Sequence, residues 1–393
     1  MANSPFLRFF YLGVGFVYTA TTLWTTLLLW QTLALTHSAL WVAMAAGSAA
    51  VPAIIVGITG PEWGFGGKMG TWLIGIGLGF LLVAPWLVHS PWMLLAMGLG
   101  EGWLSARVIP KAQAWLMSNV SPVDAPRVSA RFEMASRIGM VAGPLVAGSF
   151  ITVGGALVAT LVNAGLFVLA GGVWYGLKTK APATTPKRSA AWHALLGDGF
   201  LMTALGVRAG ANLLWPAFTV AIPLLIQNPW HAEALGYGAV RTLWGLSTVL
   251  GTWILIPRLF TKLRLAYFLS WGLTGIAFWR IGLTPHLTTA LVWVFIGALS
   301  SPIVHVALDS HIGTQVDASL QGGVFAIQRL VMGIVNLVGL FFITGVIRRV
   351  QPGPGLSDAG IAMGATAIMG LLLWSVVHAF HNQKGQVSED KRA

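Results

Sequence analysis

Apolar residues are arranged along the chain in twelve long runs, separated by short stretches that are richer in Gly, Pro or charged residues. A helix that crosses the hydrocarbon core of a bilayer needs about 20 residues, which is close to the length of each run. The pattern therefore predicts twelve membrane-spanning helices, at residues 9–35, 40–60, 69–88, 91–117, 131–154, 155–177, 195–226, 237–260, 265–283, 287–312, 322–347 and 360–381.

The twelve runs fall into two groups of six, on either side of the segment KTKAPATTPKRSAAW (178–192). Its Pro, Thr and Lys residues predict a flexible connection at the surface. We therefore expect an all-α membrane protein with an N-terminal six-helix bundle (1–177), a cytoplasmic linker (178–192) and a C-terminal six-helix bundle with a short tail (193–393). The first run lacks a small-x-small cleavage site and is too long for a signal-peptide core, so we expect it to be the first span.

Composition supports a membrane protein and excludes several kinds of chemistry. The chain is 56% hydrophobic and 9% charged, with a mean hydropathy of +0.77, which is outside the range of soluble domains. It has no Cys, which excludes disulfides, thiolate metal sites and cysteine nucleophiles. The formal charge of +12 would suggest nucleic acid in a soluble chain, but here the basic residues lie mostly in short connections beside apolar runs. Membrane topology and anionic lipid head groups explain them, so nucleic-acid binding is not expected.

The basic residues also predict the orientation. Of the 23 Lys and Arg residues, only Arg280, Arg348 and Arg349 fall on the side away from the termini. Three more, Arg208, Arg241 and Arg329, lie within apolar runs, and the remaining seventeen share the side of both termini. Because Lys and Arg are enriched on the cytoplasmic side, both termini are expected in the cytoplasm.

The two halves carry related segments. SARVIPKAQAWLMSNVSPVDAPRVSARFEMASRIGMVAG (105–143) and SSPIVHVALDSHIGTQVDASLQGGVFAIQRLVMGIVNLVG (300–339) each contain a helix, a turn with Val-Asp, and a helix start with Phe and a nearby Arg. The two segments occupy the same position in their halves. Internal repeats of this kind are typical of secondary transporters.

The decamer GMVAGPLVAG (139–148) places a proline inside the fifth run. Gly139, Gly143, Pro144 and Gly148 match the antiporter signature Gly-x-x-x-Gly-Pro-x-x-Gly-Gly, with Ala147 in place of one glycine. On this motif, and on LTHSALWVAMAAGSAAVPAIIVG (35–57) and SARVIPKAQAWLMSNVSP (105–122), the chain resembles the major facilitator superfamily, in particular the bacterial exporter branch that includes the enterobactin and macrolide efflux proteins.

The resemblance implies two pseudo-symmetric six-helix bundles that export a small amphipathic molecule by alternating access, with proton antiport as the driving force. It also implies that the bend at Pro144 packs the two halves together and resists leak. The alternative for the motif is a small-residue packing face with a tolerated kink, which needs no transport role. The resemblance also implies a place in the bacterial inner membrane. We expect a monomer that uses no cofactor.

One departure from the family concerns the connection between the second and third runs. The family usually has Asp-Arg-x-Gly-Arg-Arg there, whereas GPEWGFGGKMG (60–70) keeps only Glu62 and Lys68 as charges. The resemblance therefore implies a cytoplasmic gate that is weakened or built elsewhere, from Arg131, Glu133 and Arg137.

Ionisable residues at bilayer depth are functional candidates, because each is unfavourable unless it faces protein or water. Glu101 lies ten residues beyond Pro91, about 15 Å along a helix and near the midplane. Arg208 has a similar depth in the seventh run. Superfamily resemblance implies that spans one, four, seven and ten line a central cavity, so Glu101 and Arg208 are expected to face each other across it. Glu101 is then the proton-coupling group, a partner in a permanent salt bridge, or paired within its own half with Arg107 or Arg137.

The tenth run contains HVALDSH, in which His305 and Asp309 lie four residues apart on one helical face. His311 is on a different face, so a hydrogen-bonded pair or a coupling role for Asp309 is favoured over a metal site. Asn212, one turn beyond Arg208, is a candidate for substrate contact or for interhelical packing, and His305 and Arg107 are further candidates for substrate contact. Four tryptophans of the expected cavity-lining spans suit an amphipathic substrate or simple packing: Trp24, Trp30, Trp103 and Trp215.

These patterns favour a secondary active exporter. The alternative is a lipid or lysolipid translocator without tight ion coupling, which the reduced connection at 60–70 favours. A membrane enzyme is not expected, because no His-rich box, catalytic carboxylate pair or phosphate-binding Gly loop appears at a shared membrane depth. A sensor or assembly protein on the same scaffold stays open, since a fold hosts many functions.

Overall fold

The structure, a computed structural model, describes residues 5–59, 69–87, 89–118, 125–175, 188–259 and 262–390. These residues form helices and no strands: α1 (Pro5–Thr36), α2 (Ala39–Thr59), α3 (Met69–Leu87), α4 (Pro91–Ser118), α5 (Ala125–Val173), α6 (Arg188–Gly197), α7 (Gly199–Leu214), α8 (Pro216–Gln227), α9 (Ala234–Leu259), α10 (Leu263–Gly282), α11 (Leu287–Gln315), α12 (Ala318–Val350) and α13 (Pro352–Asp390).

Among the described residues, eight helical segments are long and apolar enough to cross a membrane. Runs of this length and composition identify the chain as an integral membrane protein. The number of twelve spans stays a prediction, although every predicted span overlaps a helix.

The longest helix contains a sharp internal boundary. Gly155 in α5 has φ 72° and ψ 179°, so two helices meet there instead of one continuing. Only glycine adopts this backbone region readily, which explains how the chain turns without a loop. The position agrees with the boundary that the apolar pattern predicts between residues 154 and 155.

The predicted seventh span is divided in the structure. Its first residues belong to α6, which also contains residues 188–192 of the predicted linker. Asp198 then caps α7 by accepting a hydrogen bond from the Leu201 amide at 2.9 Å. α7 ends before Trp215, and α8 begins at Pro216, whose missing N–H is tolerated in the first turn of a helix.

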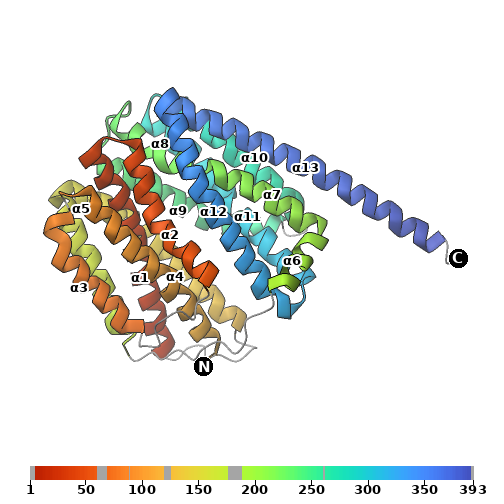
Figure 1. The fold of residues 1–393 in the computed structure, drawn as a ribbon, viewed down its shortest axis with the longest axis horizontal. Helices are drawn as coiled ribbons and strands as arrows, with labels where there is room; N and C mark the ends of the chain where they lie inside the picture. Colours follow the sequence, from red (N-terminus) through yellow and green to blue (C-terminus); the bar gives the residue numbers. More distant parts are fainter. Residues whose placement is uncertain are drawn as a thin grey trace.

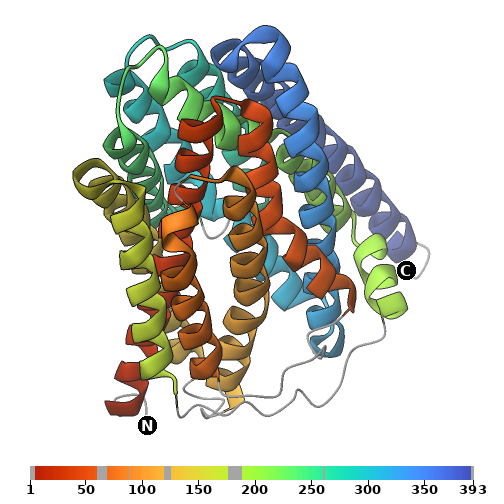
Figure 2. The same cartoon turned by 60° about the vertical axis from the view of Figure 1, so that its left-hand side comes forward.

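The helices gather into two groups, α1–α5 on one side and α7–α13 on the other (Figures 1 and 2). We call "turn end" the end of the molecule where α1 joins α2 at residues 37–38, α8 joins α9 at 228–233 and α12 meets α13 at Gln351. The opposite "terminal end" carries the N terminus and the connection of α11 to α12. The distribution of Lys and Arg predicts that the terminal end is cytoplasmic.

Each group has an aromatic core of its own. In the first, the Trp24 ring lies edge-on to Phe80 at 4.6 Å, and Phe80 stacks on Phe167 at 5.8 Å, which joins α1, α3 and α5. In the second, Phe218 stacks on Phe278 at 5.1 Å and joins α8 to α10. Because lipid tails are as apolar as these side chains, close packing rather than burial from water holds such helices together.

Two close glycine crossings repeat the same arrangement in both groups. A Cβ atom on Gly171 would lie 2.7 Å from the Gly70 carbonyl oxygen, where α3 crosses the second part of α5. A Cβ atom on Gly275 would lie 2.7 Å from the Gly360 carbonyl oxygen, where α10 crosses α13. These are the third and sixth predicted spans of each half, so the crossings support the pseudo-symmetry that the related segments indicate.

Candidate functional site

A cavity of about 400 Å³ lies between the two groups of helices. The first group contributes Thr22 of α1 and three residues of α5, whereas the second contributes residues of α7 to α12. Pockets that bind small molecules typically have volumes of about 300–1,000 Å³. The cavity is therefore large enough for a small ligand and is formed jointly by both groups.

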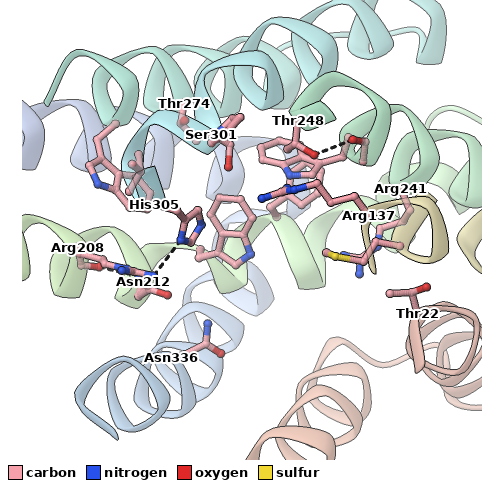
Figure 3. A pocket seen from close by; sticks show the side chains of 18 of the residues that line it. Thr22, Arg137, Arg208, Asn212, Arg241, Thr248, Thr274, Ser301, His305 and Asn336 are labelled. Atoms are coloured by element: carbon pink, nitrogen blue, oxygen red, sulfur yellow. Dashed lines mark hydrogen bonds between the residues drawn. The ribbon is translucent and has the colours of Figure 1, made fainter. Parts of the chain in front are cut away.

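Three arginines line this cavity. Arg208 of α7 donates a hydrogen bond from a terminal guanidinium nitrogen to Nδ1 of His305 on α11, at 3.2 Å. Asn212 donates to the Arg208 carbonyl oxygen at 2.8 Å, which orients the amide beside that arginine. Arg137 of α5 and Arg241 of α9 lie on the opposite side of the cavity (Figure 3).

The rest of the wall is aromatic and weakly polar. Trp215 meets Trp244 edge-to-face at 5.2 Å, and the Trp244 ring lies 5.0 Å from Phe218. Trp271 completes this apolar part of the lining. Small polar side chains add hydrogen-bonding groups between the rings: Thr22, Thr248, Thr274, Ser301 and Asn336. The combination suits a ligand with an apolar body and a polar or charged group.

The glycine–proline segment of α5 packs on two partners. Cβ atoms on Gly139 and Gly143 would lie 2.7 Å or less from backbone atoms of α1 at Gly15 and Thr19. A Cβ on Gly148 would instead lie 3.0 Å from the Ala234 carbonyl oxygen of α9, in the other group. Pro144 lies between these contacts and lines the cavity.

The two groups also meet at the turn end. A Cβ on Gly238 of α9 would lie 2.6 Å from the Pro144 carbonyl oxygen. Further toward this end, the Trp30 ring of α1 stacks on Tyr237 of α9 at 6.0 Å. These contacts place close packing between the cavity and the turn end. By contrast with these closely packed residues, Met140, which also lines the cavity, has 44% of its surface exposed.

No family model and no curated protein matches the chain in sequence. Its structure, however, matches solved transporters over nearly its full length. A bacterial homologue of the human lysosomal transporter Spinster, inward-facing and unoccupied, has a TM-score of 0.67 at 14% identity and covers 95% of this chain and 96% of its own. The POT family transporter PepTSo has a TM-score of 0.70 at 12% identity and coverages of 95% and 98%. A POT family transporter in complex with a thioalcohol-conjugated peptide reaches 0.74 at 10% identity, with coverages of 93% and 95%.

The chain has the major facilitator fold. At identities of 10–14% the likeness concerns the fold, and the site residues are judged from their own geometry.

The predicted pairing of Glu101 with Arg208 across the cavity is not what the structure shows. Glu101 is 5% exposed, accepts a hydrogen bond from Ser105 one turn away on α4, and is not among the residues that line the cavity. Arg208 contacts His305 instead, and the charge of Asp309 acts on it. Arg107, which is 7% exposed, lies over the Trp103 ring with its guanidinium carbon 4.4 Å from the centroid.

The physical reason is the packing of α4. Gly98 and Gly102 bring α4 against Ser48 and Ala49 of α2, so its polar face stays inside the first group of helices. Neither Arg107 nor Arg137 forms an ion pair with Glu101 among the described residues. The coupling role of Glu101 remains a prediction, as do the substrate contacts of Arg107.

In α11, His305 lines the cavity, while Asp309 lies one turn further toward the terminal end. Within the part of the chain that the structure describes, no group of three potential metal ligands comes together. His311 points elsewhere: its Nε2 donates to Asp198 at 2.8 Å, and its ring packs against Phe200 at 4.6 Å.

The predicted gate residues separate into three cases. Glu62 and Lys68 lie outside the described residues. Glu133 and Arg137 are 4.0 Å apart on α5, with side chains 54% and 32% exposed, and such exposed pairs contribute about 0–1 kcal/mol to stability. Arg131 acts electrostatically on Tyr11, the hydroxyl of which donates to the Val128 carbonyl oxygen at 3.4 Å. The gate role of these residues stays a prediction.

Sequence reasoning missed much of the cavity wall. Arg241, which the sequence places within an apolar run without a role, lines the cavity together with Arg137. Among the four tryptophans considered, only Trp215 is in the lining, whereas Trp24 is fully buried in the core. The ionisable character of Arg241 within an apolar run was the signal that could have identified it.

The pair formed by Asp198 and His311 joins the start of α7 to the end of α11. Its side chains are 26% and 6% exposed. Burial raises the pKa of Asp198, but hydrogen bonds from the His311 ring and the Leu201 amide outweigh that effect, so the pKa lies below its usual value. Because the pKa of Asp198 is lower in the folded than in the unfolded protein, its ionised carboxylate stabilises the fold at pH values above the unfolded-state pKa of about 3.9. This stabilisation is lost as the pH falls through the folded-state pKa.

We expect Asp198→Asn to lower the thermal stability of the purified protein at neutral pH, because the cap survives while the charged contact to His311 is lost. Asp198→Ala should cost about 0.5–2 kcal/mol more, because it removes the cap as well. The difference between wild type and Asp198→Asn should shrink as the pH falls below about 4. His311→Gln serves as a control that keeps the carboxylate; an Asp198→Asn effect that is constant at every pH contradicts the assignment.

Proposed function

We propose that this protein is a secondary transporter that moves a small amphipathic molecule across the membrane by alternating access, with the cavity as its substrate site. The observation that carries the proposal is that the cavity lies between the two halves and is lined from both. Rocking of one half against the other would expose such a site to one side of the membrane at a time. The transporter structures that share the fold support the same conclusion.

We further propose that the present conformation opens toward the terminal end, which the charge distribution predicts to be cytoplasmic. Support comes from the close packing at Gly148, Gly238, Trp30 and Tyr237, which lies between the cavity and the turn end. The direction of net transport is proposed to be outward, on the basis of the antiporter motif at Gly139–Gly148.

The transport proposal can be tested with purified protein in proteoliposomes. Compounds that raise its melting temperature are first identified, and each is then offered as a radiolabelled solute to vesicles preloaded with the unlabelled form. Transient accumulation of label by counterflow is expected for a carrier. Binding without any counterflow, from either orientation of the protein, contradicts the proposal.

Glu101 is proposed as the proton-coupling group. The Glu101 side chain is buried and accepts a hydrogen bond from Ser105 on its own helix. Gain or loss of a proton at this buried carboxyl group would therefore change the packing around it. We expect Glu101→Gln to abolish the response of transport to an imposed pH gradient while counterflow persists. Glu233→Gln is the matched control, because that side chain is exposed and is not among the residues that line the cavity. Normal pH-driven uptake by Glu101→Gln removes the residue from the mechanism.

A second candidate is a lipid or lysolipid translocator without tight ion coupling. The observation that favours it is that no Asp or Glu is among the described residues that line the cavity, so no proton carrier lies beside the substrate site. Transport that is insensitive to a pH gradient in wild-type protein, with a lysolipid as the transported species, would select this candidate.

A further inference from the structure

The cavity has an excess of positive charge. Arg137, Arg208 and Arg241 line it together with His305, and the described lining contains no carboxylate. Positive charges inside a membrane protein are unfavourable unless a counter-charge or water compensates them. The described lining residues therefore supply no negative charge to balance the three arginines.

Nearby carboxylates compensate only part of this charge. Glu133 is 4.0 Å from Arg137, but the exposed position of both side chains weakens the attraction. Asp309 acts on Arg208 from outside the lining. Arg241 forms no ion pair within the described part of the chain. Among the described residues, two carboxylates thus act on two of the three guanidinium groups, and neither carboxylate lines the cavity.

The arginines come from both halves of the fold. Arg137 belongs to α5 of the first half, whereas Arg208 and Arg241 belong to α7 and α9 of the second. Both Arg208 and Arg137 lie close enough to His305 for their charges to act on its ring. Figure 3 shows Arg208 and Asn212 on one side of His305, and Arg137 and Arg241 on the other. A negatively charged group between them would be attracted by cations of both halves.

We propose that the cavity selects amphipathic anions: a carboxylate, sulfonate or phosphate held among Arg137, Arg208 and Arg241, with an apolar body against the tryptophans Trp215, Trp244 and Trp271. This inference rests on the proposed transport function and names its substrate class. Guanidinium groups form paired hydrogen bonds with such anions, and the aromatic wall favours a flat apolar body.

The same charges explain how a substrate promotes closure. Without a ligand, drawing the halves together over the cavity brings Arg137 closer to the arginines of the second half, and like charges oppose that movement. A bound anion replaces this repulsion with attraction on both sides. The empty carrier is therefore expected to change state more slowly than the loaded one, which favours exchange over net leak.

The test uses purified full-length protein in nanodiscs and probes that share a body but differ in charge. Indole-3-acetate, indole-3-acetamide and tryptamine form one set, and lysophosphatidate with its uncharged monoacylglycerol forms a second. Binding is measured by the shift in melting temperature and by isothermal titration calorimetry. We expect an anion to bind at least about tenfold more tightly than its neutral or cationic counterpart, equivalent to about 1.4 kcal/mol.

The two sets separate the possible sources of the anion. Binding in the indole set identifies a free amphipathic acid, and binding in the lysophospholipid set identifies a lipid head group. Either result supports the proposal. Equal or tighter binding of amine or neutral probes, or no anion binding in both sets up to the solubility limit, overturns it.

Charge variants connect the binding to the cavity. Arg241→Gln and Arg137→Gln should each weaken anion binding about tenfold. Arg241→Lys should weaken it less than Arg241→Gln, because lysine keeps the charge but loses the paired hydrogen bonds of the guanidinium group. Arg264→Gln is the matched control, because this arginine is exposed and lies over the Phe200 ring, away from the cavity. Equal effects of Arg241→Gln and Arg264→Gln contradict the assignment.

Failure of this inference and failure of the proposed function have different signatures. If anion binding depends on the arginines but no counterflow occurs in proteoliposomes, the proposed anion selectivity is supported and the proposed transport function is contradicted. If an amine or a neutral compound shows counterflow, and the arginine variants do not change it, the proposed transport function is supported and the proposed anion selectivity is contradicted.

Discussion

Gly238→Leu is expected to abolish counterflow while leaving both groups of helices folded. A Cβ atom at this position of α9 would lie 2.6 Å from the Pro144 carbonyl oxygen and 3.1 Å from the Gly148 Cα atom. Both neighbours are backbone atoms of α5, so no side-chain rotation relieves the overlap. Overpacking typically costs about 1–3 kcal/mol, which corresponds to a shift of about 5–150-fold between two conformations. The state with packed turn-end contacts should lose population to the state that is open there.

The absence of native cysteines makes this shift measurable. A single cysteine at Thr248, which lines the cavity, reports access from each side of the membrane through labelling by an impermeant maleimide. Labelling from the turn end should increase in Gly238→Leu. Gly345→Leu in α12 is the control, since a Cβ there meets no atom within 4 Å. Unchanged labelling and full transport in Gly238→Leu would show that α5 and α9 do not need to separate.

Gly143→Leu is expected to prevent assembly of the first half. A Cβ at Gly143 would overlap the Thr22 hydroxyl and lie 2.6 Å from the Thr19 carbonyl oxygen and 2.7 Å from the Leu23 amide nitrogen, all on α1. The Thr22 hydroxyl shares its proton between the Tyr18 carbonyl oxygen of its own helix, at 2.7 Å, and the Gly139 carbonyl oxygen, at 3.2 Å, so separating the helices also removes the second of these contacts. We expect a loss of several kcal/mol, at or above the about 1–3 kcal/mol of ordinary overpacking, because backbone must move.

The yield of monodisperse protein and its melting temperature measure this effect. Gly172→Leu is the matched control in the same helix α5, because an added Cβ there meets open space. The expected order of stability is wild type, Gly172→Leu and then, far below, Gly143→Leu. Equal stability of the two variants would show that the α1–α5 contact adapts easily.

Together the two substitutions separate the two interpretations of the glycine–proline motif. Gly143 faces α1 inside its own half, where small residues serve packing, and Gly148 faces α9 across the boundary between the halves. The two alternatives can therefore be tested at different residues of one helix. Pro144 lies at the junction, where its ring lines the cavity and its carbonyl oxygen approaches Gly238.

The candidate site was predictable in part. Arg208, Asn212 and His305 were singled out because ionisable and amide groups are rare at bilayer depth, and the structure places all three in the cavity wall. The contributions of Arg137, Trp244 and Trp271 were not predictable, because a helix within a bundle can be apolar on its lipid-facing side and on its buried side. Periodicity alone does not tell which side faces a cavity.

The sequence by itself determined the class of the protein, the approximate positions of most of its helices and the related segments of the two halves. These depend on local properties: the length of apolar runs, Gly and Pro at boundaries, and the placement of Lys and Arg. The division at residues 178–192 stays a prediction, and residues 188–192 of that segment belong to α6. Only the tertiary structure decided that Glu101 stays inside the first half and that, among the described residues, the charged side chains that line the cavity from both halves are all arginines. Both outcomes depend on how each helix is rotated about its axis, and that rotation is set by contacts such as Gly102 against Ala49, between residues far apart in the chain.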